Sequence, residues 1–225
     1  FVKPDAYGGF TVANVDDDGN DMLDSDASSS GMTGLTTLAA GESDTSLDAG
    51  LTPPRVNLSY DFSGSSATSG SYGNVRSYTV GGVEVTATAV SRHVDKGTVK
   101  WETAWLGAYG GGHGVTDRSE GNGSNSTHTI DNVGRINYVI YQFSEKVVVD
   151  KAYLGYVIGD SDITTWIGSS ASTLTNLSDS LLGQMVKEDN NTTSSSARWA
   201  DFNNGAQAAD GNVLVIPSTT WDFTP

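Results

Sequence analysis

The chain has 225 residues, a formal net charge of −15 from 27 acidic and 12 basic residues, and no cysteine. This balance disfavours nucleic-acid and anionic-membrane partners, and the missing thiols exclude disulfides and thiolate metal sites. No run approaches the roughly 20 apolar residues that cross a bilayer, so we expect no membrane span in this chain. The 27 glycines and the abundant small polar residues predict an all-β fold of short strands and tight turns.

The first segment, residues 1–52, contains three runs with the alternation of strands, and Pro53-Pro54 follows it as an extended linker. The remainder, residues 55–225, is expected to form one larger domain. The expected strands of the first segment are 9–15, 34–38 and 45–51.

Between the first two runs lies a loop with six aspartates in eleven residues, 16–26. Calcium is coordinated by six to eight oxygens in flexible geometry, which such a loop supplies. The spacing is not that of an EF-hand, and a solvated acidic turn is the alternative. The candidate calcium ligands are Asp16, Asp18, Asn20, Asp21, Asp24 and Asp26.

The second segment begins with an expected strand at 56–62 and contains the clearest hairpin of the chain. Residues 75–80 and 83–90 alternate, and Gly81-Gly82 between them suits a two-residue turn. Strand spacing of this kind predicts a β-sandwich of jelly-roll type. Further strands are expected at 100–106, 138–143, 147–157, 163–167 and 212–216, and a short helix at 173–185 with Thr175 or Asn176 as its cap.

Two smaller acidic groups lie in the second segment. Asp117, Glu120 and Asp131 form a possible second cation site, and Asp160 with Asp162 a third. For both groups, turn formation is the alternative that we favour.

We expect no catalysis. The three histidines, His93, His113 and His128, lack zinc-ligand spacing. No glycine pattern of a nucleophile elbow accompanies the many serines and aspartates. In so acidic a chain, a pair of carboxylates is not evidence of glycoside hydrolysis.

The aromatic residues allow two interpretations. Trp101, Trp105 and Tyr109 follow one another at four-residue steps, so in a strand they would share a face and offer sugar rings a stacking surface. The favoured alternative is a core position for Trp101, Trp105, Trp166 and Trp199.

The first segment resembles the C-terminal half of an Sdr-type B repeat, a Cna-B-like β-sandwich module of bacterial surface adhesins. The resemblance implies a calcium-rigidified stalk, of which the N-terminal half is missing here. The residues that carry it are 10–16, 20–21, 24–26, Gly34, 38–42 and 47–51.

Residues 55–216 resemble an uncharacterised β-rich domain of exported bacterial proteins, including those of PEP-CTERM type. The resemblance implies export and indicates little about chemistry. The residues that carry it are 106–107, 114–117, 120–121, 128–134, 138–139, Phe143 and 152–156.

These observations together predict a secreted or cell-surface bacterial protein without catalytic activity. The chain begins at Phe1, which suggests a processed product or a fragment. The incomplete first module has too few large apolar residues for its own core and would leave strand edges unpaired. We therefore expect a calcium-stabilised subunit that self-associates or binds other surface proteins by β-strand complementation into a filament or matrix. The alternative is a glycan-binding adhesin module on a β-stalk.

Overall fold

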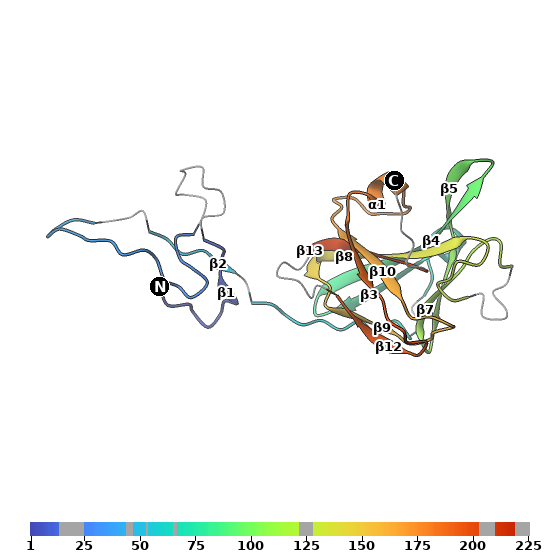
Figure 1. Ribbon diagram of the computed structural model, residues 1–225, viewed down its shortest axis with the longest axis horizontal. Helices are drawn as coiled ribbons and strands as arrows, with labels where there is room; N and C mark the ends of the chain where they lie inside the picture. The colour runs from blue at the N-terminus through green and yellow to red at the C-terminus, as the bar shows by residue number, and fades with distance from the viewer. Residues whose placement is uncertain are drawn as a thin grey trace. The chain divides into compact units, whose positions relative to one another are not determined.

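The computed structural model describes residues 1–13, 25–43, 47–52, 54–64, 67–121, 128–202 and 210–218. The chain divides into two compact units, Phe1–Leu58 and Ser59–Pro225 (Figure 1). Its regular structure is almost entirely antiparallel strand, with a sandwich in the second unit. The predicted all-β class is confirmed.

The first unit has little regular structure. Strands β1 (Gly9–Phe10) and β2 (Leu51–Thr52) pair antiparallel. Among the described residues of this unit, Ala27 is the single buried apolar side chain. The strand expected at 34–38 is wrong: these residues form no strand, and Leu35 and Leu38 are exposed. The expected shortage of core residues is confirmed for the described part of the unit.

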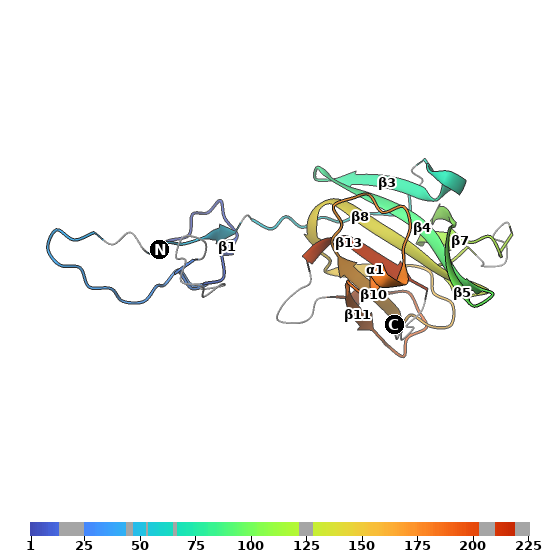
Figure 2. The same cartoon turned by 90° about the horizontal axis from the view of Figure 1, so that it is seen from above.

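The second unit is built on a seven-stranded antiparallel sheet with the order β11-β10-β13-β8-β4-β3, and β5 also pairs with β4. The two longest strands, β4 and β8, lie side by side, so each can carry neighbours along both edges (Figure 2). The strands are β3 (Val75–Val80), β4 (Val83–Asp95), β5 (Thr98–Thr103), β8 (Ile136–Val148), β10 (Ile163–Gly168), β11 (Val186–Asn190) and β13 (Asp210–Pro217).

The hairpin predicted around Gly81-Gly82 is confirmed. Val80 pairs with Val83, and the two glycines between them have φ angles of +57° and +84°. These left-handed values are natural for glycine and strained for other residues, so the pair fixes the register of β3 on β4.

One face of the central sheet is covered by two small sheets. Strands β6 (Trp105–Tyr109) and β7 (Gly112–Thr116) form one, and β9 (Lys151–Leu154) and β12 (Arg198–Asp201) form the other. Their inward side chains pack on alternate residues of β4 and β8. This layer is the larger core of the sandwich. Its central members include Leu106, Val115, Val139, Tyr141, Ala200 and Phe202.

The opposite face is covered by the segment around α1 (Asp179–Leu182), a single helical turn capped by Ser178. Leu177 and Leu182 pack there on Trp166 and Ile140. The other helical piece is the 3-10 turn η1 (Ser71–Gly73). In the described part of the chain, no helix has the length and hydropathy to cross a membrane.

Several expected elements differ from the observed ones. The run 56–62 forms no strand; instead Tyr60 and Phe62 insert their rings against the core next to Phe143 and Tyr141. The expected helix 173–185 shortens to α1, because its capping residue is Ser178. The run 100–106 is broken at Ala104, and 147–157 at Val149-Asp150.

The contact that fixes α1 to the sheet is a two-pronged ion pair. Arg92 donates from Nε and Nη2 to the two carboxylate oxygens of Asp179, each at 2.9 Å, and Trp101 Nε1 donates to the same carboxylate at 3.1 Å. Both charged side chains are partly buried, so the pair is stronger than a surface salt bridge.

We predict that Asp179→Ala lowers the free energy of unfolding by about 2 kcal/mol, because two charge-assisted hydrogen bonds from Arg92 and one from Trp101 are lost. Urea denaturation measures it. The control is Asp150→Ala: this side chain is 85% exposed and 4.0 Å from Lys151, so its removal costs below about 0.5 kcal/mol. Equal losses in the two variants would contradict the anchoring role.

Candidate functional site

The second predicted acidic group lies where β7 ends and β8 begins. Asp117 directly follows β7, Glu120 lies in the turn after it, and Asp131 precedes β8. The backbone N–H of Asn137 donates to the carbonyl of Asp131 at 3.0 Å. The structure therefore brings the three predicted carboxylates into one neighbourhood. The charges of Asp131 and Asp117 raise the pKa of Glu120, and the charge of Asp117 also raises the pKa of Asp131.

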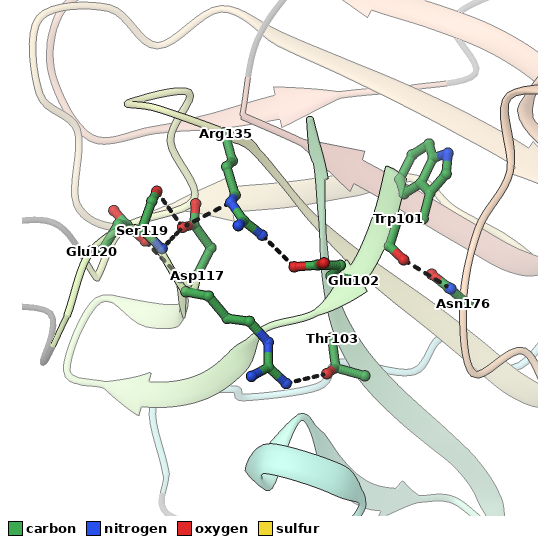
Figure 3. Close-up of polar contacts among 9 residues, drawn as sticks. Trp101, Glu102, Thr103, Asp117, Ser119, Glu120, Arg135 and Asn176 are labelled. Atoms are coloured by element: carbon green, nitrogen blue, oxygen red, sulfur yellow. Dashed lines mark hydrogen bonds and ion pairs between the residues drawn. The ribbon is translucent and has the colours of Figure 1, made fainter. Parts of the chain in front are cut away.

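Asp117 is the centre of this group and is completely buried. Its Oδ1 accepts hydrogen bonds from the backbone N–H and the hydroxyl of Ser119, each at 2.6 Å (Figure 3). Its own N–H donates to Oε2 of Glu120 at 2.7 Å. The second oxygens, Oδ2 of Asp117 and Oε1 of Glu120, are buried and have no hydrogen-bond partner among the described residues.

Two neutral side chains also carry buried polar atoms without hydrogen-bond partners among the described residues. Ser91 of β4 and Asn137 of β8 are direct cross-strand partners, and both are fully buried. They lie on the sheet face that carries Ala89 and Val139, so they form the polar end of the larger core. The Ser91 hydroxyl and both polar atoms of the Asn137 amide also lack hydrogen-bond partners in the described chain. Sequence reasoning missed this pair, because the register that joins the two strands is not visible in either one.

Arg135 supplies the positive charge at this end of the core. Its Nη1 donates to Glu102 Oε2 at 2.6 Å, and its Nε lies 3.8 Å from Asp117 Oδ1 (Figure 3). The hydrogen bond from Arg135 lowers the pKa of Glu102. Since Arg135 is engaged by Glu102, it compensates the buried charge of Asp117 only in part. Neither residue had a signal in the sequence.

Burial changes the acidity of the two remaining carboxyls. The pKa of Glu120 is raised to about 7, first by desolvation and then by the charges of Asp131 and Asp117. The amide of Asn137 favours the ionised form of Glu120, although no hydrogen bond of good geometry joins them. Desolvation also raises the pKa of Asp131, even though Val133 N–H and Thr129 Oγ1 donate to its oxygens.

Within the described ranges, no three His, Asp or Glu side chains gather closely enough to hold a metal ion by themselves. Among the described residues with unsatisfied buried oxygens are two carboxylates, Asp117 and Glu120, the amide of Asn137 and the hydroxyl of Ser91. A buried polar atom without a partner usually marks a position for ordered water or an ion. We name Ser91, Asp117, Glu120 and Asn137 the polar pocket.

The other predicted ligands fall elsewhere. Asp16, Asp18, Asn20, Asp21 and Asp24 lie outside the described residues. Asp26 is described, and its Oδ2 accepts the backbone N–H of Asp48 at 2.8 Å.

Asp160 and Asp162 accept backbone N–H groups, from Asp162 at 3.1 Å and from Thr192 at 2.6 Å respectively. This arrangement is typical of turn-forming aspartates.

The most buried histidine is enclosed by aromatic rings. His113 bonds the hydroxyls of Tyr78 and Tyr141, at 2.7 and 3.2 Å, and stacks on Phe62. Desolvation lowers the pKa of His113 to about 4, so the ring is neutral at neutral pH. With both nitrogens engaged inside the core, it is a structural residue.

We compared the chain with models of protein families, with curated proteins and with solved structures, and none of the three comparisons found a match. The two resemblances described above therefore stay hypotheses, and the argument for function depends on the geometry of the polar pocket and of the surface.

The raised pKa of Glu120 predicts a dependence of stability on pH. The folded state holds this proton up to about pH 7, while the unfolded chain releases it near the ordinary value of 4.5. Between these values the folded state binds more protons, so the free energy of unfolding falls as the pH rises. We expect Glu120→Gln to remove part of this fall.

Urea denaturation of both proteins in a chelator at several pH values between 4.5 and 8 measures the effect. The titration of Asp179 does not affect this pH range. Its pKa is lowered, so its contribution to the free energy of unfolding is lost only at more acidic pH. Identical pH slopes in the wild type and the variant would show that Glu120 titrates normally.

Proposed function

We propose that this chain is a non-catalytic, calcium-stabilised β-sandwich protein of the bacterial cell surface. The observation that carries the proposal is the polar pocket, in which two buried carboxylate oxygens, an amide and a hydroxyl all lack hydrogen-bond partners in the described chain. The amide of Asn137 interacts with Glu120, and Ser91 is the cross-strand partner of Asn137. Arg135 offsets the charge of Asp117 only in part, so the carboxylates would stabilise a further cation bound beside them.

Calcium suits this need better than other common ions. It accepts carboxylate, amide, hydroxyl and carbonyl oxygens together and tolerates irregular geometry. Asp117 and Glu120 would contribute charge, and Asn137 Oδ1 and Ser91 Oγ would contribute neutral oxygens. A divalent ion would also offset the repulsion between Asp117, Glu120 and Asp131. The competing occupant is a group of ordered waters with a proton on Glu120.

The aspartate-rich loop remains a second calcium candidate on sequence alone. Its six aspartates concentrate negative charge in eleven residues, and such a concentration attracts cations. Asp26 has one carboxylate oxygen engaged by Asp48, and its other oxygen is free of the hydrogen bonds that the structure describes.

The first unit supports the assembly part of the proposal. Met32, Leu35 and Leu38 are exposed, with Leu35 fully so. We name residues 32–38 the apolar segment. It forms no strand in the described part of the chain. An exposed apolar stretch that belongs to no sheet is suited to strand addition on another subunit. A contact of this head-to-tail kind does not close on itself, so it extends into a filament.

We predict calcium binding with a dissociation constant of about 10⁻⁴ to 10⁻³ M, as is usual for extracellular modules. Isothermal titration calorimetry and thermal melting in millimolar calcium measure it. Glu120→Gln should weaken binding at the pocket about tenfold, because one anionic ligand is lost.

Two matched variants locate the ion. Glu145→Gln changes the same charge at an exposed position of β8 and should bind as the wild type. Asp26→Asn tests the aspartate-rich loop. Binding that is lost in Asp26→Asn and kept in Glu120→Gln would move the site to the loop. No calcium-dependent heat in the wild type would refute both sites.

We predict that the protein forms filaments in calcium that electron microscopy detects and that chelation disperses. The double variant Leu35→Asp, Leu38→Asp should prevent them, because charge in the apolar segment opposes its burial in a joint. The control Val2→Asp changes a residue of the same unit that is also exposed and lies outside the segment. Dispersed monomers of the wild type in calcium would exclude assembly.

A further inference from the structure

The small sheet β9–β12 carries two large aromatic side chains on its outer surface. Trp199 of β12 is 56% exposed and Tyr153 of β9 is 55% exposed. The two residues are direct cross-strand partners, and their ring centroids lie 5.1 Å apart with a tilt of 47°. Trp199 was expected in the core, and that prediction is wrong.

Strand alternation explains why these rings face outward. Ala152 and Ala200 pair in the same register and belong to the larger core, so their neighbours Tyr153 and Trp199 must lie on the opposite face. The core beneath is filled by Leu154 and Phe202. The exposed indole of Trp199 is therefore on the outer face by design of the strand register. The core of this fold is complete without it.

Charged groups border the aromatic pair. The ammonium of Lys151 lies over the Trp199 ring, 5.3 Å from its centroid, and Asp201 is the cross-strand partner of Lys151. Lys151 and Asp201 share the outward face with the two rings because they lie two residues along each strand. Hydrogen-bond donors and acceptors therefore lie beside a flat apolar surface.

The surface is held rigidly from below. Arg198 donates to the hydroxyl and the carbonyl of Ser161, at 2.9 and 2.6 Å, and to the side chain and the carbonyl of Asn190, at 2.7 and 2.9 Å. It also donates to the carbonyl of Trp199 at 3.2 Å. Asn190 in turn donates to the carbonyl of Asp201 at 2.7 Å. A surface fixed in this way loses little conformational entropy when a ligand binds.

We propose that the outer face of β9–β12, formed by Lys151, Tyr153, Trp199 and Asp201, is a binding platform for a neutral glycan. The apolar C–H face of a sugar ring matches the flat indole, and its hydroxyls find a donor in Lys151 and an acceptor in Asp201. The net charge of −15 disfavours an anionic polysaccharide.

A second copy of the chain fits this face less well. Each strand of the small sheet has four residues, and so small a face is far below the roughly 1,000 Å² of a stable protein interface. A sugar chain needs only one or two rings in contact, which the Trp199–Tyr153 pair provides.

The test is binding of the full chain to a panel of neutral polysaccharides (cellulose, xylan, mannan and β-1,3-glucan), by co-sedimentation and by tryptophan fluorescence. We expect saturable binding to at least one of them. Trp199→Ala should weaken it at least tenfold, Tyr153→Ala less, and Trp199→Phe should keep most of it, because a flat ring remains. Tyr7→Ala, an exposed aromatic residue of the first unit, should bind as the wild type.

Circular dichroism checks that each variant is folded, and sedimentation velocity is run on the same samples. Absence of saturable binding to the whole panel, or equal binding by Trp199→Ala, would overturn the proposal. A wild-type dimer that Trp199→Ala dissociates would overturn it as well, because the face would then be a contact between copies.

Discussion

The second unit depends on the burial of its central sheet from both faces. Strands β4 and β8 are each 13 residues long and pair from Val85–Phe143 to Arg92–Ile136. Val139 and Tyr141 face one core, and Tyr138 and Ile140 face the other. Both faces of the middle of β8 are therefore buried against apolar side chains. Each buried aliphatic side chain contributes about 1.5–3 kcal/mol, and a register slip of one residue would exchange the two cores.

This constraint explains why the polar pocket is unusual. Ser91 and Asn137 lie in the same two strands and on the same face as the larger core, one step beyond Ala89 and Val139. Apolar residues at these positions would continue the core without penalty. Instead, the chain places an unpaired amide and hydroxyl there, and Glu120 interacts with that amide. Burial of polar groups without partners destabilises a fold, so a bound ion or water is the physical means of recovering that loss.

The sequence predicted what local pattern can specify. The β3–β4 hairpin, β10 and β13 follow from alternation and from the Gly81-Gly82 turn. Segment 56–62 was misjudged because its Tyr60 and Phe62 contribute rings to the core without backbone pairing. Trp199 was misjudged because alternation in a four-residue strand does not reveal which face is inward. Asp117 and Glu120 were visible as acids near a turn, but Asn137 and Ser91 became neighbours only through the β4–β8 register.

A proton and a cation compete for the same oxygens in the polar pocket. With the pKa of Glu120 raised to about 7, the pocket is partly protonated near neutral pH, and the proton reduces the repulsion among the three acids. A bound calcium ion would reduce it more strongly and would displace that proton, so calcium affinity should rise with pH. With calcium bound as proposed, the junction of β7 and β8 would be most strained in alkaline, calcium-poor solution and least strained where calcium is plentiful. The β7–β8 junction would in this way become rigid where calcium is available. The aromatic face of β9–β12 would keep its geometry in either condition, because the hydrogen-bond partners of Arg198 are neutral groups of Ser161, Asn190 and Trp199.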